Sequence, residues 1–367
     1  MSSKKGTLWP APPHTVAKIK LVEEYLVRWV RVLGLAGAKE FLIVDGFAGP
    51  GKYEDNVQGS PIAMIKAALR SRSQAPSAKF DFVFIEADED RFEHLQNHVQ
   101  KLPVVNGFNI HLLNGEFESV YPELKKQFPS SFTTRSPLFV FLDPFGAKGV
   151  PWSVVTDLLR SPTSEVLINF DADGIGRNKD NAELMDEIMG ENGWRNDLNG
   201  TKFNLFCRNL VGRYKKNLRR LPSVNYAFSF EMRTKGSGLD FFLIFASQNP
   251  KGLIEMKQAM KTIDQSGEYR FSDALIGQES FFKFDDPADY WESIWQRFKG
   301  SSPKREEVEM YILNETPFWN FHKILRIIYD RKLLKALPDD GTIRKGYFNK
   351  ANALQFIDKR NGDTLFD

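Results

Sequence analysis

The sequence predicts an α/β fold, in which helices cover both faces of a doubly wound, mostly parallel sheet. Five short apolar runs alternate with segments of helical periodicity along the first half of the chain, which is the pattern of a parallel sheet. Two further apolar runs follow, separated by a polar spacer that contains glycine. Because this second pattern is typical of a hairpin, we expect an antiparallel pair of strands to close the sheet.

A helix precedes the first predicted strand, because Ile19, Val22 and Leu26 recur at helical spacing within residues 14–34. The predicted parallel strands are apolar runs bounded by turn residues, as buried strands are. They cover residues 40–45, 80–86, 109–113, 137–143 and 165–170. The helices predicted between them cover residues 60–71, 89–101, 119–128 and 150–159. The predicted hairpin strands cover residues 226–232 and 240–247, and a helix over residues 250–263 follows them.

The length of the chain and a change in its residue pattern predict two domains. The chain has 367 residues, which is enough for about two domains. Residues 1–285 hold the alternating pattern, with a polar and basic helical insertion at residues 171–221. Residues 286–367 are helical, aromatic and charged, and residues 337–348 supply a turn and the residues of a β-wing. This small C-terminal module therefore has the outline of a winged helix-turn-helix, with a helical cap on the sheet as the alternative.

The composition excludes several classes of protein. The single cysteine, Cys207, excludes a disulfide scaffold and a cysteine-cluster metal site, and its apolar surroundings predict a packed side chain. His94 and His98 have a zinc-binding spacing but no third ligand nearby, so no metal site is predicted. No apolar run approaches the ~20 residues of a membrane helix, and residues 1–13 lack the apolar stretch of a secretory signal. We therefore expect a cytoplasmic protein with no membrane partner.

The first predicted strand ends in a glycine-rich turn, DGFAGPG. In open parallel sheets, ligands bind beyond the carboxyl ends of the strands, and glycines let the backbone approach a ligand closely. The glycine spacing differs from the dinucleotide-binding pattern, and the lysine of a P-loop is absent. The turn therefore gives little support to NAD or ATP as the ligand. A tight strand-to-helix turn is the alternative to a binding loop. The residues expected to meet a cofactor here are Asp45, Phe47, Ala48, Gly49 and Gly51.

Acidic residues lie at the ends of the next two predicted strands. Glu86 ends the second strand, where an acid can accept hydrogen bonds from both hydroxyls of a ribose. Asp88 is assigned to the N-cap of the following helix, because an aspartate there satisfies free backbone N–H groups. Glu116 follows the third strand and can accept a hydrogen bond from an adenine amino group, with an ordinary surface glutamate as the alternative.

The tetrapeptide after the fourth predicted strand is Asp143-Pro144-Phe145-Gly146. The Asp143 carboxylate and the Pro144 carbonyl can both accept hydrogen bonds from an exocyclic amine, and the proline fixes the local backbone. Phe145 can stack on a base. These three residues are the predicted catalytic residues, and a turn with a buried aspartate is the alternative.

Taken together, these strand ends resemble those of class I S-adenosylmethionine-dependent methyltransferases. The turn DGFAGPG resembles their glycine loop, Glu86 their ribose-binding acid and Glu116 their adenine-side acid. DPFG resembles the Asp-Pro-Pro-aromatic motif of enzymes that methylate amino groups of nucleic acids, but Phe145 takes the third position and Gly146 stands where the aromatic residue should be. The resemblance implies a Rossmann-like methyltransferase sheet with S-adenosylmethionine as cofactor.

A closer resemblance covers nearly the whole chain. The strings DGFAGPGKYEDNVQGSPIAMI, DPFGAKGVPW and ASQNPKGLIEMKQAM are similar to the three-Cys-motif partner protein family, called TcmP. The helix that holds His14, Thr15 and Lys18, and the tail EEVEMYILNETP…RKGYF, resemble the same family. This resemblance implies a methyltransferase-like fold and a partnership with a separate protein that bears three cysteines.

A basic segment is a second candidate site. Residues 201–235 hold nine lysines and arginines and one acidic residue, and Arg213, Lys216 and Arg220 share a face of a predicted helix. Contacts from such a stripe to phosphates would give salt-dependent binding of nucleic acid without sequence preference. We therefore expect nucleic acid as a partner and these three residues as substrate-binding, with a solvated helix face as the alternative.

Three functions are compatible with these patterns. The first is a methyltransferase that acts on nucleic acid or on a substrate held by a partner, and the second is a non-catalytic partner subunit. The third, a Mg²⁺-dependent nuclease, would use Asp143 with Asp171 or Asp173. The first requires an open pocket between Phe47 and Asp143, because a pocket filled by the protein's own side chains would leave only a scaffold.

Overall fold

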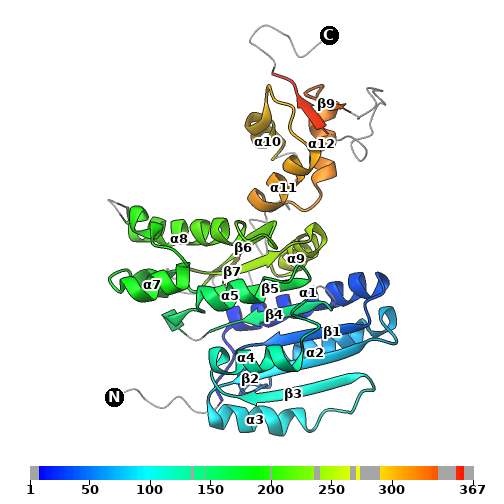
Figure 1. The fold of residues 1–367 in the computed structure, drawn as a ribbon, viewed down its shortest axis with the longest axis vertical. Coiled ribbons are helices and arrows are strands. Elements are labelled where there is room, and N and C mark those ends of the chain that lie inside the picture. The colour runs from blue at the N-terminus through cyan, green and yellow to red at the C-terminus, as the bar shows by residue number, and fades with distance from the viewer. Residues whose placement is uncertain are drawn as a thin grey trace. The chain divides into compact units, whose positions relative to one another are not determined.

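The chain is described by a computed structural model in two compact units, Met1–Ser280 and Phe281–Asp367 (Figure 1). The structure describes residues 8–133, 136–144, 146–198, 201–234, 240–264, 270–272, 290–337 and 353–358. The predicted domain boundary after residue 285 lies outside these residues and stays a prediction.

The first unit is built on a large mixed sheet with the strand order β3-β2-β1-β4-β5-β7-β6-β8 (Figure 1). Strands β1 to β5 are parallel, whereas β7 lies antiparallel between β5 and β6. The predicted fold class, a doubly wound α/β sheet closed by a hairpin, is therefore confirmed. The strands are β1 (Glu40–Asp45), β2 (Lys79–Glu86), β3 (Phe108–Asn114), β4 (Leu138–Leu142), β5 (Ser164–Phe170), β6 (Tyr226–Arg233), β7 (Asp240–Ser247) and β8 (Arg270–Ser272).

Successive side chains of a strand point to opposite faces of the sheet. Because both sets are largely apolar here, helices cover both faces. On one face, α1 packs against α2 and α9, and Trp29 of α1 lies 5.4 Å from the ring of Phe41. On the other face, Leu42 and Val44 belong to a core shared with α4, α5 and α8. The helices of this unit are α1 (Pro13–Leu35), α2 (Ser60–Arg70), α3 (Glu89–Val99), α4 (Phe117–Gln127), α5 (Trp152–Leu158), α6 (Ala172–Arg177), α7 (Ala182–Met189), α8 (Phe203–Leu218) and α9 (Pro250–Ile263).

The parallel register brings the carboxyl ends of the strands to one edge of the sheet. Asp45, the last residue of β1, is paired with Phe84 of β2 and with Phe141 of β4. Glu86 is therefore two residues beyond this level on β2, and Asp143 is two residues beyond it along the chain from β4. The turns after β1, β2 and β4 meet at this edge, as the sequence predicts.

The second unit has its own apolar core, which includes Val308, Ile312, Ile324, Ile328 and Leu354. Its strands β9 and β10 are antiparallel. Its elements are α10 (Trp291–Phe298), α11 (Arg305–Glu315), α12 (Phe321–Asp330), β9 (Leu334–Leu337) and β10 (Ala353–Phe356). All but the first residue of the predicted wing lie outside the described residues, so the winged-helix assignment stays a prediction. Across the described parts of both units, no helix combines the length and apolar character needed to cross a bilayer.

Candidate functional site

A cavity of about 390 Å³ opens at the carboxyl edge of the sheet. The turn after β1, the end of β2, the start of α4 and the turn after β4 line it, so that Phe47, Glu86, Glu116 and Pro144 meet there. Four of the residues predicted from separate strand ends thus share one cavity. Its volume lies within the ~300–1,000 Å³ range of small-molecule and cofactor sites.

Glu86 connects the turn after β1 to the residues that follow β2 at the wall of this cavity. Its side chain is buried, and its Oε2 accepts a hydrogen bond from the Gly49 backbone N–H at 2.8 Å, while Oε1 accepts one from the Asp88 N–H at 2.9 Å. Burial raises the pKa of Glu86, and the two N–H donors oppose that rise. Because a carboxylate has about four acceptor positions, Glu86 keeps capacity for hydroxyl groups of a ligand.

Asp88 and Arg91 complete the β2 side of the cavity. Asp88 is the N-cap of α3, with its Oδ1 accepting a hydrogen bond from the Arg91 N–H at 3.0 Å, which confirms its predicted role. The Arg91 guanidinium lies 4.9 Å from the ring centroid of Trp9 and lines the cavity, as does Lys148. Arg91 and Lys148 are not predicted from the sequence, because neither stands at a strand end.

Asp45, which the sequence predicts to bind a cofactor, supports the turn after β1 from inside the protein. It is fully buried, it lines neither this cavity nor the smaller one next to it, and its Oδ1 accepts a hydrogen bond from the Phe47 N–H at 3.1 Å. Burial raises its pKa to about 7. Asp45 therefore fixes the turn after β1, and the prediction that it contacts a cofactor stays a prediction.

The two predicted glycines of this turn have different roles. Both have positive φ, +64° at Gly49 and +75° at Gly51, which favours glycine. A Cβ on Gly49 would meet open space, and Gly49 and Ala48 line the smaller cavity. A Cβ on Gly51 would lie 2.8 Å from the Leu95 Cδ1 atom. Gly51 thus packs closely against α3, and its predicted approach to a cofactor stays a prediction.

Asp143 is paired with a lysine that the sequence argument did not single out as a site residue. Lys18 of α1 donates from Nζ to Asp143 Oδ2 at 2.6 Å and to Oδ1 at 2.8 Å, and its side chain is only 9% exposed. Asn169 of β5 also donates to Asp143 Oδ1, at 2.6 Å. Phe145, predicted to stack on a substrate, lies outside the described residues.

The space between Phe47 and Asp143 is therefore divided. A cavity of about 70 Å³ remains there, lined by Lys18, Phe47, Tyr53 and Asp143 among others. Phe47 lines both this cavity and the larger one. The larger cavity next to Glu86 is open. On the Asp143 side, Lys18 donates hydrogen bonds to both carboxylate oxygens of Asp143.

The carboxylates proposed for a nuclease each have a partner within the protein. Asp171 caps α6 by accepting a hydrogen bond from the Gly174 N–H at 2.9 Å, and Asp173 pairs with Arg177 at 2.7 Å. Asp143 already contacts the Lys18 ammonium, which a divalent cation would have to displace. Within the described ranges, no three His, Cys, Asp or Glu side chains are grouped so as to hold a metal ion.

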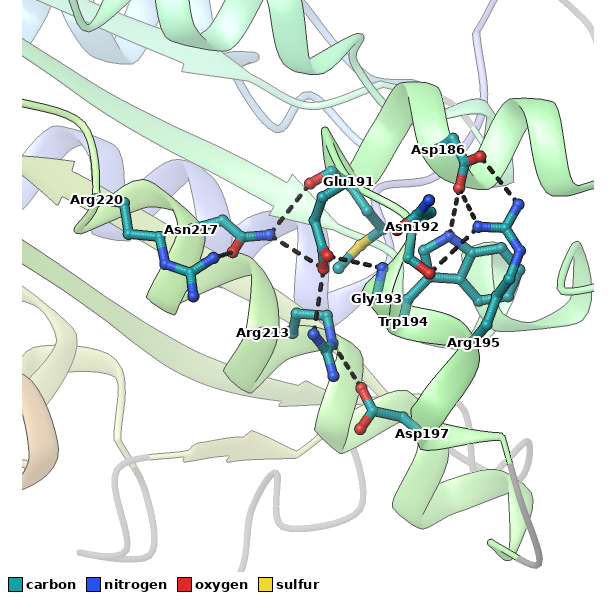
Figure 2. Close-up of polar contacts among 11 residues, drawn as sticks. Asp186, Glu191, Asn192, Gly193, Trp194, Arg195, Asp197, Arg213, Asn217 and Arg220 are labelled. Atoms are coloured by element: carbon teal, nitrogen blue, oxygen red, sulfur yellow. Dashed lines mark hydrogen bonds and ion pairs between the residues drawn. The ribbon is translucent and has the colours of Figure 1, made fainter.

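The basic stripe on α8 is partly neutralised (Figure 2). Arg213 lies between two acids, with Nε 2.7 Å from Asp197 Oδ2 and Nη1 3.3 Å from Glu191 Oε1. It therefore links α8 to the turn before it, and its predicted substrate-binding role stays a prediction. Lys216 and Arg220 are exposed, although Arg220 donates to Asn217 Oδ1 at 3.1 Å. Nucleic-acid binding by this helix stays a prediction.

Comparisons with known proteins give resemblances of fold only. No protein-family model and no curated protein matches the chain. A candidate methyltransferase of known structure from Porphyromonas gingivalis is 12% identical with a TM-score of 0.28; the match covers 60% of this chain and 40% of that one. A Legionella pneumophila protein is 10% identical over 66% of this chain and 90% of its own, with a TM-score of 0.40. The O-methyltransferase from Bacillus cereus, in complex with SAH, is 13% identical over 60% and 80%, with a TM-score of 0.33.

Proposed function

We propose that the protein binds S-adenosylmethionine in the 390 Å³ cavity and acts as a methyltransferase. The observation that carries this proposal is the buried Glu86 carboxylate at the end of β2, which holds the β1 turn and faces the cavity. An acid at this position of a doubly wound sheet is suited to bind ribose hydroxyls. Glu116, on the rim of the same cavity, is suited to accept a hydrogen bond from the adenine amino group.

The charge of the cavity also fits this cofactor. Four acidic residues line it, Glu86, Asp88, Glu116 and Glu118, against the two basic residues Arg91 and Lys148. The excess of negative charge favours a cation over a neutral or anionic ligand of the same size. S-adenosylmethionine supplies an activated methyl group, so that the protein's contribution is to hold and align the two reactants.

Titration calorimetry with S-adenosylmethionine tests the proposal. We expect binding with one site per chain, and a weakening of about threefold to tenfold in Glu116→Ala, because one hydrogen bond contributes about 0.5–1.5 kcal/mol. Glu116 is exposed and its side chain does not cap α4, so the thermal unfolding temperature of this variant should match the wild type. Absence of binding heat from the folded wild-type protein would reject the cofactor assignment.

The Lys18–Asp143 ion pair favours a second candidate function, a non-catalytic subunit that keeps the methyltransferase-like fold. In this case the protein would dock on a three-Cys-motif protein that carries the chemistry, as the TcmP resemblance implies. Co-purification with such a partner distinguishes the two candidates. A stable complex that remains active with Asp143→Ala would support the subunit, whereas a complex inactivated by that substitution would support catalysis by this chain.

A further inference from the structure

A further cavity lies at the amino ends of the parallel strands, on the opposite edge of the sheet from the site described above. This amino-edge cavity has a volume of about 120 Å³, and its walls are the second half of α1, the residues just before β4 and β5, and the first turns of α9. The volume is below the ~300–1,000 Å³ of cofactor sites, so the cavity suits one side chain or a small ion.

Glu165 of β5 is a buried acid in the wall of this cavity. The residue is only 7% exposed. Its Oε1 accepts a hydrogen bond from the Ser247 hydroxyl at 2.9 Å, and its Oε2 accepts one from the Tyr25 hydroxyl. Burial raises the pKa of Glu165, whereas these two hydrogen bonds and one from Trp29 act to lower it. Because a carboxylate has about four acceptor positions, Glu165 keeps room for one more donor.

The three donors to Glu165 are neutral, unlike the partners of the other acid of the cavity. Glu255 is paired with two cations, Lys251 with Nζ at 3.1 Å and Arg28 with Nη1 at 3.6 Å. Across the described ranges, no lysine, arginine or histidine forms an ion pair with Glu165. A buried carboxylate without a cation is costly, so the cavity offers a position for a cation from outside the chain.

The packing of α9 favours the ionised form of this carboxylate. A Cβ on Gly252, in the first turn of α9, would lie 2.0 Å from Glu165 Oε1. The glycine therefore lets the start of the helix approach the carboxylate. The partial positive charge at a helix N-terminus stabilises a negative group beside the first turn.

The other walls of the cavity are apolar and aromatic. Tyr25 and Trp29 contribute buried aromatic rings. The more exposed part of the wall consists of four half-buried apolar residues, Val32, Leu33, Pro137 and Pro162. A guanidinium is planar, is weakly hydrated and packs against aromatic rings, so it enters such surroundings at a lower cost than an ammonium. Arginine is also enriched in protein–protein interfaces, where apolar surface of this kind becomes covered.

We propose that the amino-edge cavity binds the guanidinium group of an arginine side chain from a protein partner. Glu165 is the counter-ion of this guanidinium, and the half-buried apolar residues around it contact the partner. The site lies at the edge of the sheet away from Glu86, so it does not depend on the proposed binding of S-adenosylmethionine.

Titration with Nα-acetyl-argininamide, followed by NMR, tests the charge part of this proposal. Nα-acetyl-citrullinamide has the same shape without the charge, and we expect it to bind the wild type at least about tenfold more weakly. In Glu165→Gln the two ligands should bind with affinities within about twofold of each other. Equal affinities in the wild type, or the same preference for the arginine ligand in folded Glu165→Gln, would overturn the proposal.

Leu33→Ala gives a second measurement that leaves Glu165 in place. The substitution removes apolar wall from the cavity and should weaken binding of Nα-acetyl-argininamide about threefold or more. Leu35→Ala is the matched control, because Leu35 is on the same helix and 74% exposed but does not line the cavity. If Leu33→Ala bound the ligand as tightly as Leu35→Ala, the amino-edge cavity would not be the binding site.

Free L-arginine distinguishes a protein partner from a small molecule. An arginine within a protein has no free amino and carboxylate groups, so a site for it should bind Nα-acetyl-argininamide at least as tightly as free L-arginine. Tighter binding of free L-arginine would make the occupant a small molecule and overturn the assignment to a protein partner.

Discussion

Glu86→Ala is expected to weaken the binding of S-adenosylmethionine by 100-fold or more. The substitution removes the proposed ribose acceptor and releases the Gly49 and Asp88 N–H groups that the carboxylate holds. Hydrogen bonds to a charged group contribute about 1.5–3 kcal/mol each, and about 1.4 kcal/mol corresponds to a factor of ten in affinity. Titration calorimetry at matched protein concentrations measures the difference.

Glu118→Ala is the control for this substitution. Glu118 lines the same cavity and carries the same charge, but it does not hold the β1 turn. Its removal should weaken binding only severalfold. If folded Glu86→Ala bound S-adenosylmethionine as tightly as the wild type, the ribose assignment would be wrong.

Asp45→Asn should stabilise the protein at pH 8 and change its stability little near pH 4. The pKa of Asp45 is about 7 in the folded protein, raised by burial from an ordinary value of 3.8, so the folded state holds its proton more tightly than the unfolded state. The stability contributed by this group therefore falls as the pH rises from about 4 to about 7, by at most about 4 kcal/mol. Asparagine keeps the acceptor for the Phe47 N–H and has no charge to bury.

Thermal unfolding at several pH values between 4 and 8 measures this effect. Asp81→Asn is a control of opposite sign: although burial acts to raise the pKa of Asp81, hydrogen bonds from His111 and Asn109 lower it. Loss of that carboxylate should destabilise the protein at pH 7. If Asp45→Asn followed the same stability profile against pH as the wild type, Asp45 would not be the titrating group.

Much of the fold is predictable from local patterns in the sequence. Each residue of β4 is apolar and buried. Such a continuous apolar run is typical of a strand in a sheet that is covered on both faces. Parallel strands share their carboxyl edge, so Phe47, Glu86, Glu116 and Pro144 could be placed around one cavity before their contacts were known.

Other features of the site could not be predicted from the sequence, for physical reasons. Lys18 lies on a helix outside the alternating pattern, and its contact with Asp143 depends on how that helix docks. Asp45 stands at a strand end but is fully buried and accepts a hydrogen bond from the Phe47 N–H, and sequence position alone does not indicate such burial. The ion pairs of Arg213 cannot be predicted from the charge of residues 201–235, because Glu191 and Asp197 precede that segment.

A crystal structure of the protein soaked with S-adenosylhomocysteine tests the central claim most directly. We predict the nucleoside in the cavity at the ends of β1 and β2, with both ribose hydroxyls within hydrogen-bond distance of Glu86 and the adenine amino group next to Glu116. A nucleoside bound elsewhere, or a cavity that stays empty at saturating ligand, would contradict it.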